Sequence, residues 1–379
     1  MCHGMIVASM QELIERAIAA TGLADFGAEG WQVGLGHLLD AVKTDLGHDP
    51  TAARIVESLF LGRLTSRLQV EAWYAERDAD RPPPVEGPLV IVGLPRTATT
   101  ALHYLLAVDP QFRYPRVWEM ATPVPPPDPA SERDDQRRVA AAARGSDVRH
   151  ISSVDGPTED VFIHALHFGN QEMALPVPTY RTWWRGADLT TTFAYQERVL
   201  RLLHSQRPPH RWVLKAPAYL FHLPEMSRHY PDARFVMTHR DPTAALPSTC
   251  SVVLDARRNV LPDVAQNKAA LGSEMVEHFG YGVLHAMDSR SAVGEERFLD
   301  VGQADMERDP LGTAERIYEF AGLELAGDVR VAMRGWAAQN QRGSRGVHDY
   351  TAEEFGLTVE GLRDTFAEYR KRFAAYIAP

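Results

Sequence analysis

The residues best suited to chemistry lie in a loop that follows a short apolar run. Residues 89–92 are Leu-Val-Ile-Val, an apolar, β-branched-rich run typical of a strand covered on both faces. Gly93 and Pro95 end this run, and Thr99 and Thr100 then open a helix. A strand that feeds a helix in this way directs free backbone N–H groups and the positive end of the helix dipole at one point. The stretch therefore predicts a binding site for an anion such as phosphate or sulfate.

The positive charge of this site is an arginine. The ordinary nucleotide-binding loop reads G-x-x-x-x-G-K-[ST], and this stretch matches it only in part. Counted from Gly93, Ala98 stands at the second glycine, Thr99 stands at the lysine, and the cation is Arg96. A later strand ends in His-Arg240, where a magnesium-holding aspartate could have stood. The pattern favours a phosphate site built from arginine and backbone N–H groups, without lysine and magnesium.

Taken with two later stretches, this loop resembles that of the PAPS-dependent sulfotransferases, where PAPS is 3'-phosphoadenosine 5'-phosphosulfate. The bacterial branch fits best, and its loop usually reads Pro-Arg-Ser-Gly-Thr-Thr. Here Thr97 and Ala98 replace Ser-Gly, and since a loop glycine is suited to φ > 0, its loss predicts a slightly different loop geometry. The resemblance spans about residues 88–375. It implies that PAPS is bound by Pro95, Arg96, Thr97, Ala98, Thr99 and Thr100.

The resemblance also implies a site for the 3'-phosphate of PAPS. In the family an arginine ends the third strand and a serine follows eight residues later, and Arg240 and Ser248 have this spacing. An arginine fork suits phosphate, and a hydroxyl two helical turns onward can reach the same group. Without the loop, Arg240 could equally pair with Asp241. Residues 341–346 resemble the Arg-Lys-Gly loop that closes over this phosphate. Arg342 and Gly343 are carried over from that loop, with Arg345 as the alternative arginine.

Sulfuryl transfer, like phosphoryl transfer, moves a group in line between two oxygens. Charge develops on the leaving phosphate, and we expect Arg96 to stabilise it. Lys215 begins the run Lys-Ala-Pro-Ala-Tyr at the end of the second strand. Heparan-type members carry Lys-Thr-Pro-Ala-Tyr there, whereas cytosolic members carry Lys-Thr-His. The resemblance implies a catalytic role for Lys215, but the histidine base of the cytosolic members is missing.

A carboxylate is therefore expected to act as the general base. Heparan-type and tyrosylprotein members place a glutamate beyond the phosphate loop, and Glu119, 23 residues after Arg96, lies in that region. The alternative for Glu119 is a structural ion pair with Arg113 or Arg116. The next candidates are His167 and His164, since imidazole titrates near neutral pH.

The acceptor pocket is expected within residues 110–200, read as a variable excursion from the sheet. Residues 160–200 contain no lysine and are rich in large apolar side chains. These are Phe162, Leu166, Phe168, Met173, Leu175, Tyr180, Trp183, Trp184 and Phe193. A pocket lined in this way prefers an apolar body with a polar end, which predicts a small hydrophobic or lipid-like alcohol as acceptor. The alternative is that these side chains are ordinary core.

Strands and helices alternate along most of the chain. Further strands are expected at 212–217, 234–238 and 298–301, and helices at 218–229, after Pro242, and at 263–288, 315–320, 331–338 and 358–376. Alternation of this kind predicts right-handed crossovers and an α/β fold: a P-loop-like three-layer fold with a central parallel sheet. The resemblance implies the sulfotransferase fold. Residues 1–84 are expected to form an N-terminal helical extension. Gly62 lies inside its third helical pattern and weakens the prediction of one unbroken helix there. Residues 85–379 would form the sulfotransferase domain.

Composition excludes several classes of protein. The 379 residues carry a net charge of −10, which argues against a nucleic-acid partner. Cys2 and Cys250 are too few for a disulfide framework or a cysteine zinc site, which favours the cytoplasm. The first nine residues lack the pattern of a secretory signal. No apolar run of about 18 residues occurs, so no membrane insertion is expected. We expect no metal cofactor, and a homodimer is left open.

Two other functions compete with sulfuryl transfer. One is a P-loop-type nucleotide phosphotransferase, which the missing loop lysine disfavours. The other is a non-catalytic nucleotide-binding relative that keeps the fold. Arg96, Lys215, Arg240 and Ser248 together disfavour the latter.

Overall fold

Five parallel strands form the centre of the protein, in the order β2-β3-β1-β4-β5. They are β1 (Leu89–Gly93), β2 (Phe112–Arg113), β3 (Arg211–Lys215), β4 (Arg234–His239) and β5 (Phe298–Gly302). This computed structural model describes residues 7–47, 49–77, 82–143, 153–207, 210–264, 266–340 and 350–377. The parallel sheet and four of its strands confirm the sequence prediction. The two-residue edge strand β2 was not predicted, because so short a run has no periodicity.

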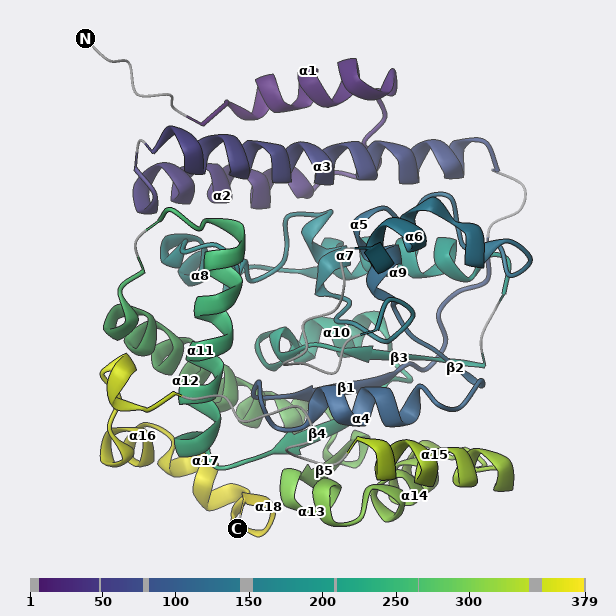
Figure 1. Ribbon diagram of the computed structural model, residues 1–379, viewed down its shortest axis with the longest axis vertical. Coiled ribbons are helices and arrows are strands. Elements are labelled where there is room, and N and C mark those ends of the chain that lie inside the picture. The colour runs from purple at the N-terminus through teal and green to yellow at the C-terminus, as the bar shows by residue number, and fades with distance from the viewer. Residues whose placement is uncertain are drawn as a thin grey trace.

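Alternating side chains of the strands enter two separate cores, which gives the fold its three layers (Figure 1). Leu89 and Ile91 belong to one core, and Val90 and Val92 belong to the other. The first core includes α4 (Thr99–Leu106), α14 (Pro310–Ala321) and α15 (Gly327–Gln339), with α13 (Gln303–Arg308) beside them. The second includes α9 (Thr190–His204), α10 (Leu223–His229), α11 (Pro242–Val260) and α12 (Lys268–Val293). The predicted three-layer α/β fold is confirmed.

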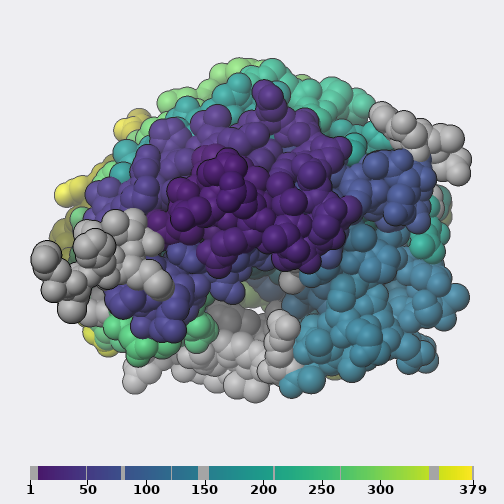
Figure 2. Space-filling view, turned by 90° about the horizontal axis from the view of Figure 1, so that it is seen from above, coloured from purple at the N-terminus to yellow at the C-terminus, as the bar shows by residue number. Residues whose placement is uncertain are grey.

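Three N-terminal helices cover one end of the molecule: α1 (Met10–Thr21), α2 (Trp31–Asp45) and α3 (Pro50–Ala75). They form the uppermost layer of Figure 1 and much of the surface seen in Figure 2. Helix α3 begins with Asp49 accepting hydrogen bonds from the N–H groups of Thr51 and Ala52. It runs unbroken through Gly62, the residue that weakened the prediction of one continuous helix. Burial of an apolar face outweighed the weak helix propensity of one glycine.

Short helices fill the region between the N-terminal layer and the sheet. They are α5 (Val117–Ala121), α6 (Gln136–Ala143), α7 (Val161–Ala165) and α8 (Pro178–Trp184). The helix expected at 218–229 is divided into a 3₁₀ turn at Pro217–Phe221 and α10. The helix expected at 358–376 is divided into α16 (Val359–Thr365), α17 (Ala367–Arg372) and α18 (Ala374–Ile377). Within the described residues, no helix is long and apolar enough to cross a membrane.

Candidate active site

The loop between β1 and α4 lies at the carboxyl end of the central strand. Gly93 has φ +153°, and a Cβ there would lie 2.5 Å from the Thr238 carbonyl oxygen on β4, so only glycine fits. The Thr97 hydroxyl contacts the Leu94 carbonyl oxygen (2.7 Å) and the Thr238 hydroxyl (2.6 Å). These contacts hold the loop against the neighbouring strand.

Two residues of this loop adopt left-handed backbone conformations, Arg96 with φ 68° and Ala98 with φ 70°. The glycine usual at position 98 in the resembling loop adopts such a φ without strain, whereas alanine does so at a cost. Ala98 is also the N-cap of α4, and within the described residues no side chain caps that helix end. The first N–H groups of α4 thus remain suited to an anion at the carboxyl edge of the sheet.

Three of the predicted residues converge on this loop. The Arg96 Nε donates a hydrogen bond to the Ser248 hydroxyl on α11 (3.0 Å), and Arg240 Nη1 donates to the Arg96 carbonyl oxygen (3.0 Å). Burial lowers the pKa of Arg96 from its ordinary value, which means that the surroundings disfavour an isolated positive charge. An anion bound here would relieve that cost. Arg240 and Ser248, which were paired by their spacing, thus each contact Arg96, and their binding of the 3'-phosphate stays a prediction.

Helix α11 is positioned so that Ser248 faces the loop. Asp241 caps it by accepting a hydrogen bond from the Thr243 N–H (2.9 Å), and Pro242 occupies its first turn, as predicted. Asp241 also forms an ion pair with Arg370 of α17 (3.2 Å). Asp241 thus contacts Arg370, and Arg240 contacts the loop through the Arg96 carbonyl oxygen.

Lys215 lies on the neighbouring strand, at the same edge of the sheet. It ends β3, which pairs with β1 at Ile91. Its ammonium group lies 2.8 Å from a carboxylate oxygen of Glu159, and its backbone N–H donates to Asp160 (2.8 Å). Because β3, β1 and β4 are adjacent, Lys215, the loop and Arg240 follow three neighbouring strand ends, where open α/β sheets bind ligands.

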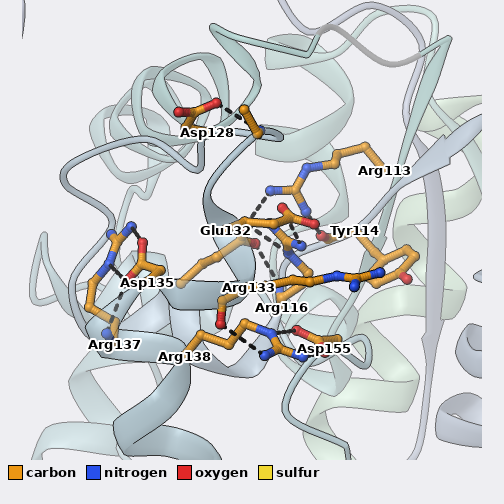
Figure 3. Close-up of polar contacts among 12 residues, drawn as sticks. Arg113, Tyr114, Arg116, Asp128, Glu132, Arg133, Asp135, Arg137, Arg138 and Asp155 are labelled. Atoms are coloured by element: carbon orange, nitrogen blue, oxygen red, sulfur yellow. Dashed lines mark hydrogen bonds and ion pairs between the residues drawn. The ribbon is translucent and has the colours of Figure 1, made fainter.

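Glu119 has a different environment from the one expected of a free base. It is fully buried in α5 and accepts hydrogen bonds from Arg113 and, at 2.7 and 2.9 Å, from the Arg116 guanidinium. Its second oxygen accepts the Arg116 backbone N–H (2.9 Å). Arg116 also pairs with Glu132 at 3.0 Å, as the dashed lines in Figure 3 show. The structure thus has both arginine pairs that the sequence offered as the alternative.

The predicted histidines lie within the packed layer near the N-terminal helices. His167 contacts Arg67 of α3 through Nδ1 and Thr191 of α9 through Nε2, each at 3.1 Å. His164 packs against the rings of Phe193 and Tyr219. Burial lowers the pKa of both imidazoles to about 3. In the contacts described for the chain, neither histidine meets Arg96, Lys215, Arg240 or Ser248.

The aromatic residues proposed for the acceptor pocket are mostly core. The side chains of Leu166, Phe168, Leu175, Tyr180, Trp184 and Phe193 are buried. The Trp184 Nε1 donates to the Gly169 carbonyl oxygen (2.7 Å), and its ring packs against Phe221 and His222. Trp183 is partly buried and stacks on His37 of α2. Of the named set, Phe162 on α7 is the side chain that lies largely exposed, at 50%.

The third predicted part of the phosphate site, Arg342, Gly343 and Arg345, lies outside the described residues. Among the residues that the structure does describe, no group of three or more histidine, cysteine, aspartate or glutamate side chains is arranged to hold a metal ion.

Two acidic residues that contact Lys215 at the carboxyl edge of the sheet, Glu159 and Asp160, were not predicted as site residues. In the sequence they read as the start of a helix, because an acidic pair before an apolar run is typical of one. Asp160 is fully buried, where it accepts a hydrogen bond from Gln196 as well as from the Lys215 N–H. Burial raises its pKa to about 7. No spacing signal joins these acids to Lys215, 55 or more residues later, because only the folded chain brings them together.

The chain belongs to the sulfotransferase family, whose model matches residues 88–327. The fold is that of two solved mycobacterial enzymes. Sulfotransferase STF9 from Mycobacterium avium is 31% identical, with a TM-score of 0.87 over 98% of this chain and 97% of that one. Sulfotransferase STF1 from Mycobacterium tuberculosis H37Rv is 28% identical, with a TM-score of 0.81 over 96% of this chain and 99% of that one. No match was found among the curated proteins. The family resemblance inferred from the loop is confirmed.

Proposed function

We propose that this sulfotransferase transfers a sulfuryl group from PAPS to the hydroxyl of a small hydrophobic acceptor. The observation that carries the proposal is the convergence of Arg96, Ser248 and Arg240 around the uncapped start of α4. Helix N–H groups and arginines are suited to a nucleotide with several phosphate groups. A donor of this type matches the family to which the chain belongs.

The residues at the sheet edge are proposed to have two roles, donor binding and stabilisation of the leaving group. Arg240 and Ser248 would hold the 3'-phosphate, while Pro95 to Thr100 would wrap the 5'-phosphosulfate. Arg96 and Lys215 would stabilise the charge that develops on the leaving 5'-phosphate. The acceptor oxygen attacks sulfur in line, the bond from sulfur to the phosphate oxygen breaks, and that oxygen keeps the electron pair. The positive charge of these side chains and the helix N–H groups is sufficient for this chemistry, so we propose that transfer needs no metal.

A hydrophobic acceptor is supported by an exposed apolar face made by the neighbouring helices α7 and α5. Phe162 lies three residues after Glu159 on α7 and leaves half of its side chain accessible. Val117 on the adjacent helix α5 is also exposed, at 39%. An apolar body with a hydroxyl end would lie against such side chains. This face replaces the buried aromatics as the proposed contact of the acceptor.

The direct test is a screen with sulfur-labelled PAPS and three acceptor classes: phenols, lipid alcohols and sugars. We expect labelled product with phenols or lipid alcohols, tight calorimetric binding of the desulfated product PAP, and unchanged rates after chelator treatment. Binding of PAP without transfer to any acceptor would instead indicate a non-catalytic relative. Activity that is lost on chelation and restored by magnesium would support a phosphotransferase.

A further inference from the structure

We infer that Glu159 is the general base that removes the proton from the acceptor hydroxyl. The inference rests on the proposed function and adds a catalytic residue to it. A general base must lie within hydrogen-bond reach of the acceptor oxygen, must be deprotonated, and must be free to receive a proton. The carboxylates and histidines near the site differ in these three respects.

Glu119 fails the last requirement. One of its oxygens is shared by Arg113 and Arg116, and the other accepts the Arg116 backbone N–H. Its side chain has no exposed area. Protonation would leave two largely buried guanidinium groups without their counter-charge, which is strongly unfavourable. Glu119 is therefore a structural anion that fixes the start of α5.

The two histidines fail on basicity and position. Their burial favours the neutral imidazole, but His167 engages both ring nitrogens with Arg67 and Thr191. These partners belong to α3, one of the N-terminal helices, and to α9, which packs below it (Figure 1). Since burial lowers the pKa of His164 and His167 to about 3, each is a weak base.

Glu159 differs from these groups in its exposure and in its partner. Its carboxylate lies 2.8 Å from the Lys215 ammonium group, and 32% of its side chain is exposed. The ion pair holds the carboxylate beside Lys215, which ends β3 next to the strand that leads into the phosphate loop. A ligand that draws Lys215 toward its phosphate would leave the Glu159 carboxylate facing the acceptor.

The backbone around Glu159 is fixed from both sides. Thr158 donates its N–H to the Pro115 carbonyl oxygen (2.9 Å), and Pro157 forms an isolated antiparallel bridge with Arg116. On the other side, the buried Asp160 accepts the Lys215 N–H. Glu159 is thus held between the α5 segment and the end of β3, a rigid placement of the kind that acid–base catalysis requires.

The proton balance of the step is simple. The acceptor O–H bond breaks and its proton moves to a Glu159 oxygen. A bond forms between the acceptor oxygen and sulfur, while the bond from sulfur to the 5'-phosphate oxygen breaks. Lys215 stabilises the phosphate oxygen that keeps the electron pair. Glu159 then returns the proton to solvent, and no further reactant is required.

The test compares Glu159→Gln with wild type and with Glu354→Gln. Glu354 forms a similar pair with Lys268 (2.6 Å), where α12 packs against a short 3₁₀ turn, and so provides a matched control. Transfer from PAPS is measured with two acceptor pairs, octanol with difluorooctanol and phenol with pentafluorophenol. Within each pair the fluorinated acceptor has the more acidic hydroxyl. PAP affinity is measured by calorimetry.

We expect Glu159→Gln to lower kcat for octanol or phenol by about 10²- to 10⁴-fold. The loss should shrink at least tenfold for the fluorinated partner, because an acidic hydroxyl needs less help to ionise. PAP affinity of this variant, and all rates of Glu354→Gln, should stay within twofold of wild type. An equal loss for both members of a pair would overturn the inference, since it would mean that Glu159 only positions Lys215. Full activity of Glu159→Gln would also overturn it. If wild type itself transferred nothing to any acceptor, the proposed function would fail first.

Discussion

The carboxyl edge of the sheet and the aromatic segment at residues 160–204 use their side chains in opposite ways. At the sheet edge, partly exposed Arg96 and Arg240 hydrogen-bond across elements far apart in sequence and leave α4 without a side-chain cap. In the aromatic segment, Trp184 and Phe193 are buried completely. In the first region, burial destabilises the arginine charges, and a bound anion would offset that destabilisation. The second buries apolar area and thereby holds the first in place. A side chain's chemistry therefore indicates function only when its burial is known.

Among the tests of this comparison, Trp184→Ala is expected to have the largest effect, a loss of stability. Removing a fully buried tryptophan leaves a cavity beside Phe221 and an unpaired Gly169 carbonyl oxygen. The free energy of unfolding should fall by about 3–5 kcal/mol, as measured by urea titration. The adjacent, partly exposed Trp183→Ala serves as control and should lose less. If Trp184→Ala kept its stability but lost affinity for octanol, the segment would be an acceptor pocket after all.

Arg96→Ala tests the opposite side of the comparison. Removing one preorganised donor from a charge-stabilising site lowers kcat by about 10²- to 10³-fold, so labelled transfer should fall by that factor while stability changes little. Arg16, which pairs with Glu57 on the surface at 48% exposure, provides the control substitution to alanine. An unchanged rate of labelled transfer in Arg96→Ala would mean that the Arg96 side chain takes no part in the reaction.

Arg240→Ala separates nucleotide binding from catalysis. A hydrogen bond to a charged group contributes about 1.5–3 kcal/mol, so the Kd for PAP should rise tenfold or more in calorimetry. Ser248→Ala, which removes a neutral hydroxyl, should have a smaller effect. The exposed Arg228→Ala is the matched control. An unaltered PAP affinity in Arg240→Ala would mean that Arg240 does not bind the 3'-phosphate.

The smallest effect is expected from Phe162→Ala, the one large apolar side chain of the segment that lies half exposed. Covering its remaining area with an acceptor would contribute about 1 kcal/mol, so KM for octanol should rise about fivefold with no loss of stability. Val331→Ala, equally apolar and exposed on α15, is the control. A stability loss without a change in KM would place Phe162 with the buried aromatics.

The loop residues could be predicted because their signal is local. Gly93 and Arg96 lie at and just after the end of a recognisable strand. Arg240 and Ser248 are eight residues apart, on the connection from β4 to α11 and within α11 itself. Glu119 shows the limit of such reasoning. Its type and distance from Arg96 suited a base, but its partners Arg113 and Arg116 determine what it does.

The sequence by itself determined the parallel α/β sheet, the strand-loop-helix segment at residues 89–106 and the family, because strand patterns, turns and helix starts depend on near neighbours. The tertiary structure alone decided that Glu159 meets Lys215, that Glu119 is sealed between two arginines, and that Trp184 belongs to the core. These outcomes depend on contacts between segments far apart in the chain. Such contacts set burial and charge pairing, and no local pattern of residues encodes either.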